Sequence, residues 1–197
     1  MGSRFQKFSK RFETHFRRWT RSVAEQAQQY LQGLMQARRK NMERMEEVVP
    51  ECDYQSLHHF VSESAWDAQA VSDQVAVEAD RLLGGSVDSC LLLDESSFEK
   101  KGEKSVGVAR QWRGWIAWHH HVALVIMAML FMLEEKLSHQ QSHPLLSCSD
   151  IEVLLAHFLP RRDVTVEEVV RQMEARHQAR QRAIASAYRR QQLADSG

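Results

Sequence analysis

Apolar residues recur every three to four positions along most of the chain, which is the spacing of helices with one buried face. The N-terminal stretch carries such a stripe between lysines and arginines, formed by Phe5, Phe8, Phe12 and Phe16. A second helix is predicted over residues 19–35, with inward positions at Val23, Ala27, Tyr30, Leu31 and Leu34. Shorter helices are predicted over residues 42–49, where Pro50 ends the pattern, and over residues 54–61.

The later helices have recognisable start signals. Ser64 is predicted to cap a helix over residues 65–83, because a serine hydroxyl can accept an N–H of the first turn. After residue 112 the pattern is again helical, first to about residue 138 and then from Ser149 to residue 158, with Glu152 at the capping-box position. A last helix is predicted over residues 165–192, and its apolar side carries Val166, Val169, Val170, Met173, His177, Ile184 and Tyr188.

Residues 88–112 have a different pattern. The apolar run at residues 90–93 ends on Asp94 and is typical of a buried strand. A charged stretch containing Gly102 predicts a turn, and residues 105–109 return as a second strand. The sequence therefore predicts a mostly α-helical fold with one small β-hairpin.

The longest apolar run covers residues 122–133 and raises the possibility of a membrane span. It is shorter than the roughly 20 residues that cross a bilayer core, and extending it would bury His119, His120 and His121. We interpret it as the core helix of a larger protein and do not expect a membrane partner. The three histidines are interpreted as packing residues, because successive helical positions point about 100° apart and cannot converge on one metal ion.

Composition gives few further limits on function. The chain has 197 residues, 43% of them apolar, and its formal net charge is zero. Cys52, Cys90 and Cys148 are widely separated, which argues against a disulfide framework and against a cysteine zinc site. The N-terminus lacks the apolar segment of a signal peptide. We expect a cytoplasmic protein.

Charge is distributed unevenly. Residues 1–44 carry eleven basic and three acidic side chains, whereas residues 45–98 carry twelve acidic side chains and one basic side chain. This asymmetry has two interpretations: a basic arm that binds nucleic acid, or a basic arm folded onto an acidic body of the same protein. The cations that we consider for DNA binding are Arg11, Arg17, Arg18, Arg21, Arg38, Arg39, Lys40, Lys100 and Lys101. For the last two, a solvated charged turn is an equal alternative.

One segment carries a family resemblance. The sequence from residue 91 to residue 112 is LLLDESSFEKKGEKSVGVARQW. It resembles the first-aspartate block of insertion-sequence transposases of the DDE superfamily, whose catalytic domain has an RNase H-like fold. Residues 54–71 resemble the helical region that precedes this domain, and residues 112–163 resemble the helical region that ends these proteins.

The resemblance implies what this chain has lost. In the family, three carboxylates hold two Mg(II) ions for DNA strand cleavage and transfer, and Asp94 stands at the position of the first. The strands that carry the second Asp and the Glu should lie between Gln111 and Gly114, where the two blocks instead abut. The resemblance therefore implies an internally deleted protein with an incomplete metal site at Asp94, no functional cofactor and no catalysis. Glu95, Glu99, Glu103, Glu134 and Glu135 are not expected to replace the missing ligands.

The predicted organisation has four parts: a basic helical arm at residues 1–50, a helical region at 51–87, a hairpin with Asp94 at 88–112 and a C-terminal helical region at 113–197. The fold would be the remnant of an RNase H-like α/β core lacking most of its sheet. The partners implied are DNA at terminal inverted repeats, an intact transposase, or a second copy of the chain. Three functions stay open: an inactive remnant, a DNA-binding or subunit-poisoning regulator of an intact element, and an unrelated helical scaffold or membrane-associated protein.

Overall fold

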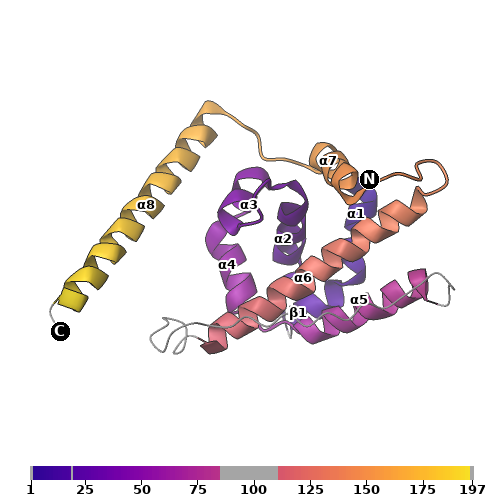
Figure 1. Cartoon of the computed structure of the whole chain (residues 1–197), viewed down its shortest axis with the longest axis horizontal. Helices are drawn as coiled ribbons and strands as arrows, with labels where there is room; N and C mark the ends of the chain where they lie inside the picture. Colours follow the sequence, from indigo (N-terminus) through magenta and orange to yellow (C-terminus); the bar gives the residue numbers. More distant parts are fainter. Residues whose placement is uncertain (1, 19, 85–110, 196–197) are drawn as a thin grey trace. The chain divides into compact units, whose positions relative to one another are not determined.

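A computed structural model describes residues 2–18, 20–84 and 111–195, and these residues are mostly helical (Figure 1). The predicted fold class is confirmed in its helical character. The predicted hairpin, including Asp94, Lys100 and Lys101, lies outside the described residues apart from its last two positions, which begin a helix. The chain divides into two units, residues 1–160 and residues 161–197, which are described separately below.

The N-terminal phenylalanine stripe is buried as predicted. Helix α1 (Gly2–Arg11) and the 3-10 helix η1 (Glu13–Phe16) place all four phenylalanine rings in the core of the first unit. The chain then forms a short antiparallel ladder, β1 (Arg17–Arg18) with β2 (Arg21–Ser22), in which Arg17 pairs with Ser22 and Arg18 with Arg21. The ladder corrects the predicted start of the second helix at residue 19.

Helix α2 (Ala24–Gln36) therefore begins after the ladder. The Val23 N–H donates to the Phe16 carbonyl at 2.9 Å and closes the ladder, while the Ala24 N–H donates to the Ser22 hydroxyl at 3.3 Å. Of the predicted inward positions on this helix, Ala27, Tyr30, Leu31 and Leu34 are buried, and Val23 packs against the core from its edge. The periodicity therefore located the buried face, although it did not reveal where the helix starts.

Three further helices follow, each capped by an Asn or Asp side chain: α3 (Met42–Val48), α4 (Tyr54–Ser62) and α5 (Ala68–Leu83). The prediction that Ser64 caps the last of these is wrong. Asp67 is the cap, and its carboxylate accepts the Ala70 N–H at 3.0 Å. Ser64 is buried, and its hydroxyl lies 3.3 Å from the His59 carbonyl oxygen at the end of α4.

The C-terminal part of the first unit consists of α6 (Gln111–Ser138) and α7 (Cys148–Phe158). The predicted capping box of α7 is shifted by two residues. Ser147, not Ser149, is the cap, and Asp150, not Glu152, completes the box by accepting the Ser147 N–H at 2.9 Å. The pairs Ser147/Asp150 and Ser149/Glu152 both have the three-residue spacing of a capping box, and the helix begins at the earlier pair.

Helix α6 is the centre of the first unit and packs against α2, α4, α5 and α7. Its Phe131 ring contacts the rings of Phe5 and Phe8 from α1, with centroids 5.4 and 5.2 Å apart. Helices α5 and α6 lie side by side and run in the same direction (Figure 1). Segments on both sides of residues 85–110 therefore build one core.

Helix α6 is also long enough and apolar enough to cross a membrane. Its segment Trp115–Ser138 has a mean hydropathy of 1.8 and is the single such helix in the described parts of the chain. This is weak evidence, because the core helix of a soluble protein passes the same test. Within the first unit, the α6 side chains of Leu124, Met127 and Phe131 are fully buried.

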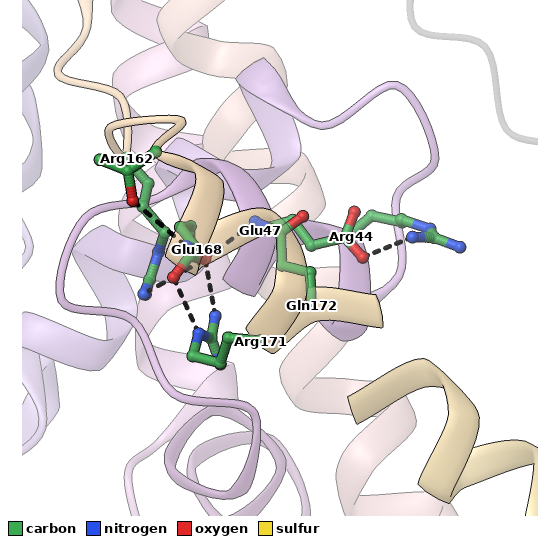
Figure 2. A network of polar contacts seen from close by, with 7 residues as sticks. Arg44, Glu47, Arg162, Glu168, Arg171 and Gln172 are labelled. Atoms are coloured by element: carbon green, nitrogen blue, oxygen red, sulfur yellow. Dashed lines mark hydrogen bonds and ion pairs between the residues drawn. The ribbon is translucent and has the colours of Figure 1, made fainter. Parts of the chain in front are cut away.

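The second unit contains α8 (Val166–Asp195), close to the predicted residues 165–192. The Thr165 hydroxyl accepts the Glu168 N–H at 3.2 Å and caps the helix. Figure 2 shows Arg171 and Arg162 directed at the Glu168 carboxylate, at 2.8 and 3.8 Å. The Arg171 hydrogen bonds to this carboxylate lower the Glu168 pKa to about 2. In the first unit, the same figure shows Arg44 paired with Glu47 within α3.

Gly33 sets the separation between α2 and α3. A Cβ at this position would lie 2.5 Å from Cγ and 2.7 Å from Cβ of Met45, so that the two helices would have to move apart. Overpacking of this kind costs about 1–3 kcal/mol, which exceeds the gain of up to about 1 kcal/mol in helix propensity from Ala. We expect Gly33→Ala to lower the free energy of unfolding in urea. Glu25→Ala, at an exposed position of the same helix, should change it by less than about 0.5 kcal/mol; a Gly33→Ala variant as stable as the wild type would contradict the close approach.

Candidate nucleic-acid interface

The described residues do not supply a two-metal site of the DDE kind. No group of three His, Cys, Asp or Glu side chains in the described parts of the chain could hold a metal ion. Glu134 and Glu135 each contact an arginine of α1 and have a structural role in the core. The DDE chemistry needs three convergent carboxylates, and Asp94, which the resemblance assigns to the first of them, lies outside the described residues.

Besides Arg44, which pairs with Glu47 within α3, three cations of the basic arm bind carboxylates on other helices of the first unit. Arg4 on α1 pairs with Glu135 on α6 at 2.8 Å. Arg11 pairs with Glu78 on α5 at 2.9 Å and with Glu134 on α6 at 2.5 Å. Lys40 pairs with Glu152 on α7 at 3.3 Å.

The interpretation that the basic arm folds onto an acidic body of the same protein holds in part: of the four carboxylates that pair with these cations, only Glu78 lies in the acidic segment 45–98, and the others lie on α6 and α7. The buried member of the set is Glu135, whose side chain is only 4% exposed. Burying a carboxylate is costly unless it is paired and hydrogen-bonded. Arg4 is thus needed by the core, and the charge of Arg11 is already shared between two carboxylates.

Four other candidate cations are exposed: Arg17, Arg21, Arg38 and Arg39. None of them makes an ion pair within the described parts of the chain. The first two lie in the ladder that precedes α2, and the other two follow its last residue. Because α2 has 13 residues, its length keeps the two groups about 20 Å apart along the helix. The backbone of Arg18 belongs to the same ladder.

The ladder is fixed to the core at its base. The Phe16 ring is buried against the rings of Trp66 and Phe60, with centroids 5.1 and 6.1 Å away. Arg17 follows this anchor directly, so the position of its backbone is set by the core. Cations presented on a rigid base lose less conformational entropy when they bind a phosphate than cations on a flexible tail.

A cleft of about 1080 Å³ lies beside the ladder. Its lining includes Arg17, three histidines (His15, His119 and His120) and two carboxylates, Glu63 and Asp67. His15 is held by Gln74, whose side-chain oxygen lies 2.5 Å from the ring Nε2. The mixed charge of the lining does not define an anion site, so the cleft by itself does not indicate a ligand.

Of the three consecutive histidines, His120 and His121 are packing residues, as predicted, whereas His119 is exposed. His120 is buried, stacks on Trp66 with ring centroids 4.0 Å apart, and has Nδ1 2.8 Å from the Val61 carbonyl oxygen. His121 Nδ1 lies 2.8 Å from the Tyr30 hydroxyl, and His119 contacts the Trp115 ring. The three rings have different neighbours and do not converge.

A family model described as DDE superfamily endonuclease matches residues 8–120, which is more than half of the chain. The chain belongs to the DDE superfamily endonuclease family. No curated protein and no solved structure is similar enough to extend this assignment.

Membership in the DDE superfamily confirms the broad resemblance on which the sequence interpretation rests. The matched segment begins within α1, contains Asp94 and ends in the first part of α6. The DDE superfamily acts on DNA and typically uses divalent metal ions, so DNA is the partner class that the family implies. The match extends across the described helices on both sides of residues 85–110.

The sequence did not reveal that Arg17 and Arg21 lie in a strand pair. The stretch Arg17–Ser22 includes Trp19 and Thr20, and both residue types favour strands. The helical spacing of apolar residues continues beyond Phe16, so the sequence pattern favoured a helix over this stretch instead of a strand. The sequence also could not divide the cations of the arm into those that pair internally and those that are exposed, because their carboxylate partners are distant in sequence.

Burial gives the first unit a defined pH response. It lowers the pKa of His120 despite two nearby carbonyl oxygens, and it lowers the pKa of His121. A histidine whose folded pKa is depressed contributes stability above its unfolded pKa of about 6.5, and this stability is lost as the pH falls below that value. We expect the free energy of unfolding to drop below pH 6.5, by at most about 1.4 kcal/mol per pH unit for each histidine.

His120→Gln tests this response. Urea unfolding at pH 7.5 and pH 5.5 should show a smaller acid-induced loss of stability in the variant than in the wild type. A His157→Gln variant, changed at an exposed ring of α7, serves as the control and should behave like the wild type. Equal losses in all three proteins would show that burial of His120 does not control the response.

Proposed function

We propose that this chain is an internally deleted DDE transposase that has lost catalysis. One observation carries the proposal: α5 ends at Leu83 and α6 begins at Gln111, so that only residues 84–110 separate the two helices. That length suffices for a hairpin, since strands commonly have five to six residues. It does not accommodate the further strands that carry the second Asp and the Glu in the family, and the described chain after residue 111 is without strands.

DNA binding is the activity that the remaining residues support. The exposed cations Arg17, Arg21, Arg38 and Arg39 are available to phosphate oxygens, whereas Arg4, Arg11 and Lys40 are paired with carboxylates of the first unit. Such contacts give salt-sensitive and mostly sequence-independent affinity, because each neutralised phosphate releases condensed counterions. We propose terminal inverted repeats as the physiological target, from the family's role in transposition.

A second candidate is regulation of an intact transposase by mixed assembly. The observation that favours it is the shared core, since helices from both sides of residues 85–110 pack on one another. A chain that keeps this helical unit can present the same subunit surfaces as an intact relative and lack its catalysis. In this case the chain would reduce transposition by joining inactive complexes.

The assignment of the DNA-binding cations is tested with a double variant. We expect Arg17→Gln/Arg21→Gln to weaken binding to duplex DNA in a gel shift and to reduce the slope of log K against log salt by about 2, one for each phosphate contact. The matched control is Arg81→Gln/Lys136→Gln, which removes two exposed positive charges outside the arm and should leave both quantities unchanged. If both variants weaken binding equally, net charge and not the ladder controls affinity.

Catalysis is tested with DNA carrying inverted-repeat ends. We expect no nicking by the wild-type chain in Mg(II) or in Mn(II), because a single family carboxylate cannot hold two ions. The Asp94→Ala variant is the control for contaminating nuclease. Nicking by the wild type that disappears in Asp94→Ala would overturn the proposal that the site is incomplete.

A further inference from the structure

Helix α8 presents a long apolar stripe that its own unit does not cover. Val166, Val170, Met173, Ile184 and Tyr188 have side chains between 47% and 76% exposed. Their spacing of mostly three or four residues, continued through His177 and Gln181, places them along one side of the helix. The stripe therefore extends over about six turns.

A helix of this kind is expected to need a partner. Isolated helices are marginal in water, and most helical stability in proteins comes from packing an amphipathic face. The second unit consists of α8 and the short segment before it, and its own residues leave the stripe exposed. Something outside the unit has to cover these side chains.

The spacing of residues along the stripe is the same from both ends. Val166 and Tyr188 are equally distant from His177, and so are Val170 and Ile184, and Met173 and Gln181. Two copies of α8 packed antiparallel about a two-fold axis at His177 would therefore place Val166 against Tyr188 and Val170 against Ile184. An isologous contact requires such a self-complementary surface.

Charge along the helix favours the same orientation. The part before Ala175 carries Glu167, Glu168 and Glu174 and a single arginine. The part from Ala175 onward carries five arginines, Arg176, Arg180, Arg182, Arg189 and Arg190, and one acidic residue, Asp195. A parallel pair would bring like charges together along both halves, whereas an antiparallel pair brings the acidic half of each copy to the basic half of the other.

We propose that α8 is a self-association element that covers its stripe with the α8 of a second copy in antiparallel orientation. The occupant follows from the internal symmetry of the stripe and the separation of charge along it. This proposal does not rest on DNA binding or on the loss of catalysis, and it concerns a part of the chain outside the segment that matches the family.

The oligomeric state of the full chain is the first test. We expect a concentration-dependent dimer in analytical ultracentrifugation, with association at least about tenfold weaker in Val170→Ala/Ile184→Ala. Alanine has the highest helix propensity, so this variant truncates two of the five apolar side chains of the stripe and keeps the helix, as circular dichroism would verify. Gln178→Ala, on the same helix and outside the stripe, is the matched control and should dimerise like the wild type.

The orientation is tested by disulfide trapping with two chains of different size. One carries V170C and the other I184C, both with Cys90 and Cys148 replaced by Ser, and they are mixed under a mild oxidant. The antiparallel arrangement predicts a disulfide between V170C of one chain and I184C of the other, with little V170C–V170C product. A predominance of V170C–V170C would indicate parallel pairing and overturn the proposal.

Two further outcomes would also overturn it. A wild-type chain that stays monomeric at high concentration would show that the stripe is covered within one molecule or not at all. Binding of the monomer to lipid vesicles through α8, lost in Val170→Ala/Ile184→Ala, would assign the stripe to a membrane surface instead. In either case the proposals on DNA binding and catalysis would be unaffected, because separate measurements test them.

Discussion

The burial of α6 between the N-terminal helices and α5 is the contact on which the rest of the first unit depends. Phe131 of α6 meets the phenylalanine stripe of α1, and His120 near the other end of α6 stacks on Trp66 before α5. These contacts join residues more than fifty positions apart on either side of residues 85–110. The ladder, the paired cations and the exposed cations all take their positions from this core, because the helices that carry them are packed around α6.

Hydrophobic periodicity predicted the helices and their buried faces well. The four phenylalanines and the inward face of α2 were located correctly because burial of apolar area dominates folding and leaves a clear period in the sequence. Boundaries were less predictable, since Ser64 and Asp67, or Ser147 and Ser149, offer equivalent caps and tertiary contacts select one of each. The division of the basic arm was not predictable at all, because the carboxylates Glu78, Glu134 and Glu135 reach Arg4 and Arg11 only through the fold.

The basic side chains of the N-terminal arm fall into two groups in the structure. Internal ion pairing and exposure to a nucleic acid are therefore not alternatives, because different side chains account for each. Arg4, Arg11 and Lys40 neutralise carboxylates and contribute to stability, whereas the arginines at the two ends of α2 face solvent. Net charge over a segment is thus a poor guide to nucleic-acid affinity unless the internal ion pairs are subtracted.

The double ion pair of Arg11 has a consequence for how proteins of this family can change in length. Its guanidinium joins Glu78 on α5 to Glu134 on α6, the two helices that flank residues 85–110. The entropy of closing the loop between such clamped helices grows only with the logarithm of its length, by about 0.6 kcal/mol for each doubling. An insert between them can therefore be shortened or lengthened by evolution at small thermodynamic expense, and the loss of an enzymatic domain need not entail the loss of the scaffold that carried it.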